Sequence, residues 1–339
     1  MRLPAEQFVE RPPKSLSGIY VIYGAEPLAA LEAADLFREL ARAGGFIERE
    51  VFTAEANFDW GRLAAAGSAL SLFATQRMIE IRLPTGKPGR EGSAAIENYC
   101  QRPPEDTLTL VTLPDIDWQG KQTKWFTALE KTATMIEAAA VERPQLPRWL
   151  AGRLSRQQQS CNAAALEFLA DRVEGNLLAA RQEIQKLALL CPPGEISLAV
   201  LEASVANVSR FNPFQLVSAL YDDVEGGKAA RIARMLDGLK AEGEAPPLIL
   251  WVLANEVRTL LRARGATRAG RPPPPSKARE LEANAKRHSV KGLARLNQLA
   301  ARIDRMVKGL DGDDPWQHLF QLACGIAGVK STVARAEWA

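Results

Sequence analysis

The sequence predicts an α/β domain with a mostly parallel sheet, followed by two all-helical domains. Over residues 1–142, short apolar stretches with strand character alternate with helical stretches, and strands that are joined through helices become parallel neighbours in a sheet. After Pro144 and Pro147 the strand-like stretches stop, and Ala, Leu, Glu, Gln and Arg dominate, which favours helices. Because 339 residues exceed what one hydrophobic core usually organises, we expect division into domains.

The predicted strands are short and apolar. The first covers 19–23, ends at Gly24 and is followed by a helix over 27–40. An apolar run without polar alternation is typical of a strand that is buried on both faces. Further strands are predicted at 50–53, 78–83, 108–113 and 134–138. Five strands separated by helical segments predict a doubly wound α/β domain.

Apolar residues at helical spacing predict the two helical domains, over 143–210 and 211–339. In the first, Pro192-Pro193-Gly194 ends a stripe that consists of Leu177, Ala180, Ile184, Leu187 and Cys191. In the second, helices are predicted at 216–221, 229–239, 246–264 and 293–310. The four prolines within 271–276 predict an extended, exposed connection, because proline has a fixed φ and no N–H.

Composition excludes several classes of protein. With 24% charged residues and no apolar run of about twenty residues, we expect no transmembrane helix. The N-terminus has no secretory-signal pattern, so we expect a cytoplasmic location. The four cysteines lie far apart and there are only two histidines, so we expect buried thiols, no disulfide framework, no metal site and no histidine catalysis; these residues are Cys100, Cys161, Cys191, Cys324, His288 and His318.

The turn after the first strand is where a phosphate-binding loop would stand in an ATPase. That loop requires G-x-x-x-x-G-K-[ST], so that backbone N–H groups, a lysine and a hydroxyl hold the phosphates and Mg²⁺. Here Gly24 is followed by Ala-Glu-Pro-Leu-Ala-Ala-Leu, and Glu26 would place negative charge beside a triphosphate. We therefore expect no tight ATP binding and no cofactor. Asp115 and Asp117 stand where catalytic carboxylates would, and we interpret them as ordinary loop residues.

A leucine-phenylalanine pair precedes the strand that begins near Arg77, in the stretch Leu70-Ser71-Leu72-Phe73-Ala74. Leu72 and Phe73 are adjacent, so they cannot both face one core in a helix or a strand. Two interpretations stay open from the residues alone. The pair is either an exposed anchor for a protein partner or two residues that pack on different sides of a domain edge.

Basic residues outnumber acidic ones between Arg258 and Lys308, although the net charge of the whole chain is only +3. This region is either a surface that faces DNA or a partner, or a solvated helical face with a basic loop. Both interpretations stay open.

Several motifs in these regions resemble the delta subunit family of bacterial clamp loaders. The resemblance covers most of the chain in the family's order, through 20–28, 71–74, 124–126, 174–177, 182–187, 211–214 and 236–243. It implies an AAA+-like architecture: a degenerate P-loop-like α/β domain over 1–142, a helical lid over 143–210 and a helical collar over 211–339.

The resemblance also implies a site and partners. Family members insert a leucine-phenylalanine pair into a hydrophobic pocket of the beta sliding clamp, and by motif this pair is Leu72 and Phe73, flanked by Leu70 and Ser71. The implied partners are this clamp, the gamma/tau and delta prime subunits through the collar, and primed DNA in the assembled complex. The lid arginine that senses the γ-phosphate in ATP-binding relatives corresponds to Leu178 here.

The resemblance therefore implies a subunit that opens the clamp without hydrolysing ATP and has no catalytic site of its own. Two other functions compete with it. One is an ATPase with a divergent phosphate loop, which ATP turnover by the isolated chain would favour. The other is a stand-alone DNA-binding protein, which a steeply salt-dependent DNA affinity would favour.

Overall fold

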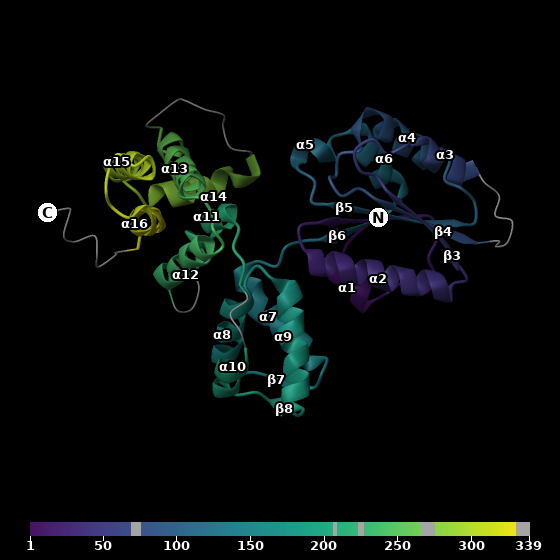
Figure 1. Cartoon of the computed structure of the whole chain (residues 1–339), viewed down its shortest axis with the longest axis horizontal. Helices are drawn as coiled ribbons and strands as arrows, with labels where there is room; N and C mark the ends of the chain where they lie inside the picture. The colour runs from purple at the N-terminus through teal and green to yellow at the C-terminus, as the bar shows by residue number, and fades with distance from the viewer. Residues whose placement is uncertain (69–75, 206–208, 223–226, 266–274, 330–339) are drawn as a thin grey trace. The chain divides into compact units, whose positions relative to one another are not determined.

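The computed structural model describes residues 1–68, 76–205, 209–222, 227–265 and 275–329. The chain divides into two compact units, Met1–Val141 and Glu142–Ala339. The first is an α/β body and the second is helical (Figure 1).

One six-stranded sheet forms the centre of the N-terminal unit, in the order β1-β6-β2-β5-β4-β3. Every neighbouring pair in this sheet is parallel. The central strand β2 has β5 on one side and β6 on the other, and its Val21 lies opposite Val111 and Met135. The strands are β1 (Arg2–Pro4), β2 (Ile19–Gly24), β3 (Glu48–Thr53), β4 (Arg77–Arg82), β5 (Thr107–Pro114) and β6 (Thr134–Ala138).

Helices cover both faces of the sheet (Figure 1). On one face lie α1 (Ala5–Glu10) and α2 (Pro27–Ala43); on the other lie α3 (Gly61–Ser68), α4 (Gly89–Gln101), α5 (Trp118–Lys121) and α6 (Lys124–Thr132). A parallel sheet buries apolar side chains on both faces, so two cores form. Tyr20 and Phe37 belong to the core under α1 and α2, whereas Tyr23 and Phe126 belong to the other core.

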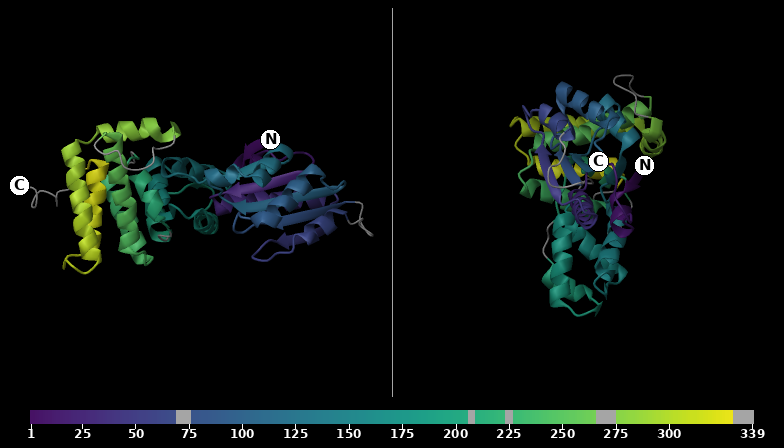
Figure 2. Two further views of the ribbon diagram at one scale, coloured as in Figure 1. Left: turned by 90° about the horizontal axis from the view of Figure 1, so that it is seen from above. Right: turned by 90° about the vertical axis from the view of Figure 1, so that its right-hand side faces the viewer.

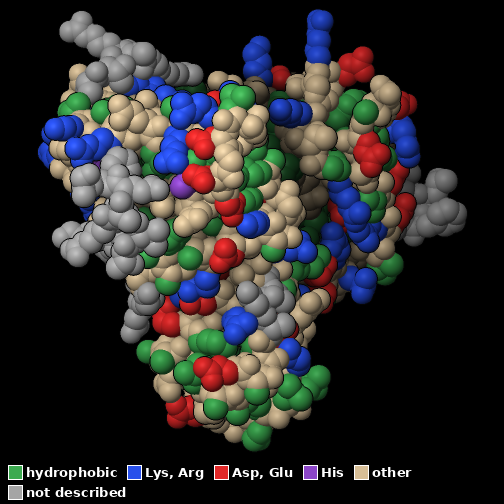
Figure 3. All heavy atoms as spheres, turned by 60° about the vertical axis from the view of Figure 1, so that its left-hand side comes forward, with side chains coloured by type: hydrophobic (Ala, Val, Ile, Leu, Met, Phe, Trp, Pro, Cys, Tyr) green, Lys and Arg blue, Asp and Glu red, His purple; other side chains and the backbone are tan. Residues whose placement is uncertain are grey.

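The first part of the second unit is a small helical bundle. Along α9 the buried side chains are Leu177, Ala180, Ile184 and Leu187, which is the predicted stripe. At the C-terminal end of α9 Leu189 is 88% exposed, and hydrophobic side chains gather at this end of the bundle (Figure 3). Its elements are η1 (Arg143–Gln145), α7 (Leu146–Ser155), β7 (Gln159–Ser160), α8 (Ala163–Val173), α9 (Leu177–Leu190), β8 (Gly194–Glu195) and α10 (Leu198–Ser204).

The second part of this unit contains longer helices packed around α13, which contacts α11, α14, α15 and α16. Several of these helices run alongside one another in the left view of Figure 2. The elements are η2 (Pro213–Gln215), α11 (Leu216–Ala219), α12 (Lys228–Ala241), α13 (Pro246–Ala263), α14 (Pro275–Lys286), α15 (Val290–Val307) and α16 (Pro315–Ala327).

The predicted fold class is confirmed as a parallel α/β unit followed by a mostly helical remainder. All five predicted strands are present, and β1 was missed. The expectation that strands stop after Pro147 was wrong, because β7 and β8, of two residues each, form a parallel pair. The division at 142/143 and 210/211 into three domains stays a prediction.

The predicted extended connection over 271–276 was wrong at its end, because α14 begins at Pro275. Proline is tolerated in the first turn of a helix, where its missing N–H would have no partner in any case. Residues 271–274 of that prediction lie outside the described residues. Cys100 and Cys324 are buried, as predicted, whereas Cys161 and Cys191 are half-buried. Within the described part of the chain, no helix is both long and apolar enough to span a membrane.

Candidate functional site

The turn between β2 and α2 lies at the carboxyl ends of the central strands, where parallel α/β sheets hold their ligands. Glu26 occupies the N-cap position of α2. Its Oε1 accepts a hydrogen bond of 3.1 Å from the Leu28 N–H. Burial raises the pKa of the Glu26 carboxyl, and the hydrogen bond from Leu28 opposes this effect. A carboxylate of the chain itself thus occupies the end of α2 that would attract a phosphate.

The same turn is packed tightly against β6. The Glu26 N–H donates to the Ala138 carbonyl oxygen at 3.0 Å. Gly24 has a φ of +142°, and a Cβ built on it would lie 2.1 Å from the same oxygen. Only glycine fits this position. Gly24 is the last residue of β2 and lies in register with Pro114 of β5 and Ala138 of β6, so it belongs to the sheet and not to an open phosphate cradle.

Asp115 and Asp117 have structural partners at the end of β5. Asp117 is the N-cap of α5, and its carboxylate accepts a 2.7 Å hydrogen bond from the Gly120 N–H. Asp115 lies 3.8 Å from the ammonium of Lys121. These contacts agree with the interpretation of both as loop residues. Among the described residues there is no cluster of His, Cys, Asp and Glu suited to a metal ion.

The predicted clamp-binding residues Leu70, Ser71, Leu72 and Phe73 lie outside the described residues. The structure describes the elements on either side of this segment, α3 and β4. Arg77, the first residue of β4, ties them together: its guanidinium donates to the Ala66 carbonyl oxygen in α3 and, at 3.3 Å, to Oγ1 of Thr107 in β5. The two described elements on either side of this segment are thus linked through the Arg77 side chain.

The turn before α9 corresponds to the predicted position of a phosphate sensor. Gly175 has a φ of +75°, and a Cβ there would lie 1.8 Å from the Arg210 carbonyl oxygen. Asn176 caps α9 by accepting a 3.2 Å hydrogen bond from the Ala179 N–H. Leu178 is 42% exposed. A leucine side chain has no hydrogen-bond donor for a phosphate.

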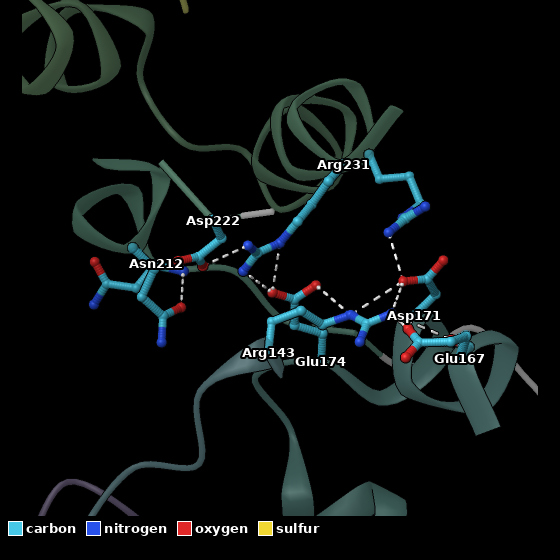
Figure 4. A network of polar contacts seen from close by, with 9 residues as sticks. Arg143, Glu167, Asp171, Glu174, Asn212, Asp222 and Arg231 are labelled. Atoms are coloured by element: carbon cyan, nitrogen blue, oxygen red, sulfur yellow. Dashed lines mark hydrogen bonds and ion pairs between the residues drawn. The ribbon is translucent and has the colours of Figure 1, made fainter. Parts of the chain in front are cut away.

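A network of ion pairs joins the small helical bundle to α12 (Figure 4). Nη2 of Arg231, on α12, donates to Oε1 of Glu174 at 2.6 Å, and its Nη1 donates to Asp222 at 2.7 Å. Arg231 and Glu174 are both buried. On the bundle side, Arg143 pairs with Glu167 at 2.6 Å and with Asp171 at 2.7 Å.

Sequence reasoning missed this network, although a signal for it exists. Arg231 lies on the apolar stripe of α12, four residues before Met235. A buried arginine requires a carboxylate partner, and Glu167 and Asp171 lie four residues apart on one face of α8, with Glu174 at its C-cap. The helical spacing predicts that such partners exist, but not which arginine each carboxylate meets.

The fold and the β2–α2 turn define a class of protein: a parallel α/β unit with a glutamate carboxylate at the N-terminus of the helix after its central strand, joined to a helical unit. The sequence model of the family "DNA polymerase III, delta subunit" matches residues 20–139. Over 264 residues the chain is 31% identical to the DNA polymerase III subunit delta of Escherichia coli K12, covering 78% of this chain and 76% of the relative. The chain belongs to the DNA polymerase III delta subunit family.

Two further proteins are similar to this chain. The chain is 27% identical to the DNA polymerase III subunit delta of Haemophilus influenzae, over 77% of this chain and 75% of the relative. The solved structure of the Bacillus subtilis DNA clamp loader delta protein is 20% identical, has a TM-score of 0.47, and is matched over 96% of this chain and 98% of that one.

Proposed function

We propose that this chain is the clamp-opening subunit of a bacterial clamp loader. It binds the beta sliding clamp through Leu72 and Phe73, flanked by Leu70 and Ser71, and opens it for loading onto primed DNA. It does so without binding or hydrolysing ATP. Membership of the delta subunit family supports the first part, and the carboxylate of Glu26 at the N-terminus of α2 is the observation that carries the second.

The charge of Glu26 and the missing hydrogen-bond donor at Leu178 both disfavour ATP binding. A triphosphate at the end of β2 would meet the Glu26 carboxylate and would have to displace it from the Leu28 N–H. The negative charges of the phosphate and of the Glu26 carboxylate would repel each other strongly in this partly buried site. The sensor position holds Leu178, which cannot bind a phosphate. Neither element of a nucleotide site is available, so the chain responds to ATP that neighbouring subunits bind.

The link between α3 and β4 and the apolar area of Leu72 and Phe73 both support the anchor. Arg77 links β4 to α3 and to β5 through hydrogen bonds to Ala66 and Thr107. A partner that binds the segment between α3 and β4 is therefore coupled to the sheet. Burial of two large apolar side chains supplies roughly 1.5 to 3 kcal/mol each. Loss of both therefore weakens binding by about 10² to 10⁴.

Clamp opening then follows from differential affinity alone. A subunit that binds the opened clamp better than the closed one shifts the clamp's equilibrium by the ratio of the two affinities, with no hydrolysis at this step. The gamma/tau and delta prime subunits, bound through the collar over 211–339, control access to the anchor. Primed DNA enters only in the assembled complex.

Surface plasmon resonance of the purified chain on an immobilised cognate clamp tests the anchor. We expect nanomolar to low-micromolar binding that falls by about 10² or more in a folded Leu72→Ala, Phe73→Ala variant. Leu189→Ala with Leu190→Ala, two exposed leucines on α9, is the matched control and binds like wild type. No binding by wild type refutes the proposed function, whereas equal binding by both variants refutes the site.

Calorimetric titration with Mg-ATP tests the second part. We expect no heat of binding and no change in clamp affinity for the isolated chain, but stronger clamp binding with ATP once the motor subunits are present. ATP binding or turnover by the isolated chain would favour the divergent ATPase instead.

A further inference from the structure

Glu80, in β4, is a fully buried carboxylate. A buried carboxylate requires a cation and hydrogen bonds. Arg38, on α2, supplies both, because its Nε donates to Oε2 of Glu80 at 3.2 Å and its Nη2 donates to Oε1 at 2.9 Å. One arginine bound in this two-point way neutralises one carboxylate. Two more arginines nevertheless bind the same side chain.

These two further arginines belong to the last two strands of the sheet, β3 and β4. Arg49, on the edge strand β3, donates through Nε and Nη2 to Oε2 of Glu80 at 3.0 and 2.6 Å. Arg82, the last residue of β4, donates to Oε1 through Nε alone, at 2.8 Å. The side chains of Arg49 and Arg82 are 39% and 43% exposed. Glu80 is thus surrounded by two more cations than its own charge requires, and they are the two at the surface.

Part of each surface guanidinium group points away from Glu80. A guanidinium is planar and holds its N–H donors in fixed directions. Arg49 therefore directs Nη1 outward, and Arg82 directs both Nη1 and Nη2 outward. In the described part of the chain these three nitrogens have no hydrogen-bond partner. Because the two groups meet the two oxygens of one carboxylate, they lie close enough together for a single anion to accept from both.

The sheet face that carries these arginines is open to solvent. Alternate residues of a strand point to the same face, so Arg49, Val51 and Thr53 share the face of β3 that adjoins Glu80, and all three are exposed. In the parallel register Val51 lies opposite Glu80, and Thr53 lies opposite Arg82. The Thr53 hydroxyl is thus a further donor beside Arg82. An anion can reach all of these donors from the solvent side.

The donors and the surrounding charges indicate which anion fits. A phosphate group presents three strongly accepting oxygens and can accept from two guanidinium groups at once, whereas one guanidinium already satisfies a carboxylate. A nucleic-acid strand would need a row of cations along its phosphates. Exposed carboxylates instead lie on the elements that carry Arg38 and Arg49; they are Asp35, Glu39, Glu48 and Glu50. These charges repel an extended polyanion and favour a small ligand.

We propose that Arg49 and Arg82, oriented by the buried Glu80, form a binding site for one phosphate group, supplied by inorganic phosphate or by the phosphate monoester of a small metabolite. Calorimetric titration of the full-length chain with inorganic phosphate and with glycerol 3-phosphate, in a phosphate-free buffer, tests the proposal. We expect a Kd of about 1 mM or lower for at least one probe. Equal affinities indicate that the phosphate group alone is recognised, and tighter binding of glycerol 3-phosphate assigns the site to a phosphorylated metabolite.

Substitutions at the two surface arginines separate recognition from bulk charge. We expect Arg49→Met and Arg82→Met each to weaken phosphate binding by about tenfold or more. Arg82→Lys keeps the charge but loses the planar fork, so it should weaken binding by about threefold or more. Arg90→Met, which removes an exposed arginine of α4, is the matched control and binds like wild type. Melting followed by circular dichroism verifies that each variant is folded.

Three outcomes would overturn the phosphate site. The first is the absence of binding by wild type to either probe. The second is an equal loss in Arg90→Met and Arg82→Met, which would reveal only the net charge of the chain. The third is binding of a single-stranded oligonucleotide, weakened by Arg49→Met, without binding of either small phosphate, because the face would then be a nucleic-acid contact. None of these outcomes bears on the proposed clamp binding, which is measured separately.

Discussion

Removal of the Arg231 guanidinium tests whether the ion network holds the small helical bundle to α12. Arg231→Met keeps the apolar stem but removes the hydrogen bonds of 2.6 and 3.2 Å to Glu174 and the bond of 2.7 Å to Asp222. Glu174, only 8% exposed, then keeps Arg143 alone, at 3.8 Å. A buried carboxylate left without its main partner destabilises a protein by about 3 to 5 kcal/mol.

Arg234→Met is the matched control. The side chain of Arg234 is 38% exposed, and its partner Asp171 keeps a second ion pair with Arg143 at 2.7 Å. The expected loss is below about 1 kcal/mol. Adding Glu174→Gln to Arg231→Met removes the uncompensated charge, so the double variant loses less than Arg231→Met alone.

Hydrogen exchange measured by mass spectrometry is the appropriate assay, because two compact units need not unfold in one transition. We expect Arg231→Met to accelerate exchange in α8 and α12 by about 10² or more, while β2 and β5 of the other unit keep their protection. Equal effects of Arg231→Met and Arg234→Met would refute the reasoning. Faster exchange in β2 and β5 would also refute it.

Two further predictions concern the α/β unit. Burial raises the pKa of Glu80, but hydrogen bonds from Arg38, Arg82 and Arg49 outweigh this and lower it to about 2. Because the folded pKa lies below the unfolded one, the carboxylate stabilises the fold above about pH 4.5, and this contribution disappears as the pH falls towards 2. In urea titrations the free energy of unfolding of wild type should exceed that of Glu80→Gln by on the order of 2 to 3 kcal/mol at neutral pH. This difference should shrink by pH 3, and a difference that stays constant with pH would contradict the assignment. Gly24→Ala should cost more than about 3 kcal/mol, since its Cβ would meet Ala138, whereas Gly18→Ala, with a φ of +75° but open space around it, should cost about 1 kcal/mol; equal losses in thermal melts would show that the close approach to β6 is unimportant.

The sheet could be predicted because short stretches rich in apolar and β-branched residues alternate with helical ones. The clearest case is β2, which is buried on both faces, appears as an apolar run and was placed almost to the residue. β1 was missed because it has three residues, includes Arg2 and Pro4, and pairs on one side only. Its strand character comes from the pairing with β6, which local sequence does not encode.

The chemical character of the candidate site could be predicted from the sequence, but the contacts between its residues could not. Glu26 could be recognised as unfavourable for a phosphate, because the type of residue decides that. The approach of Gly24 to Ala138 depends on how β2 and β6 pair. The pairing of Arg231 with Glu174 joins residues 57 positions apart, and sequence spacing carries no information about contacts between such distant residues.

The order of strands in the sheet also constrains how the chain folds during synthesis. Arg2 pairs with Met135, and β2 lies between two strands that the ribosome makes much later. At 5 to 20 residues per second, roughly 7 to 27 s pass between emergence of Arg2 and emergence of its partner Met135. Until β5 emerges the apolar β2 has no native strand partner, and until β6 emerges it has a partner on one side only, so the nascent chain exposes an unpaired strand edge of the kind that favours aggregation. A ribosome that stalls before Thr134 would leave a fragment that cannot close its sheet.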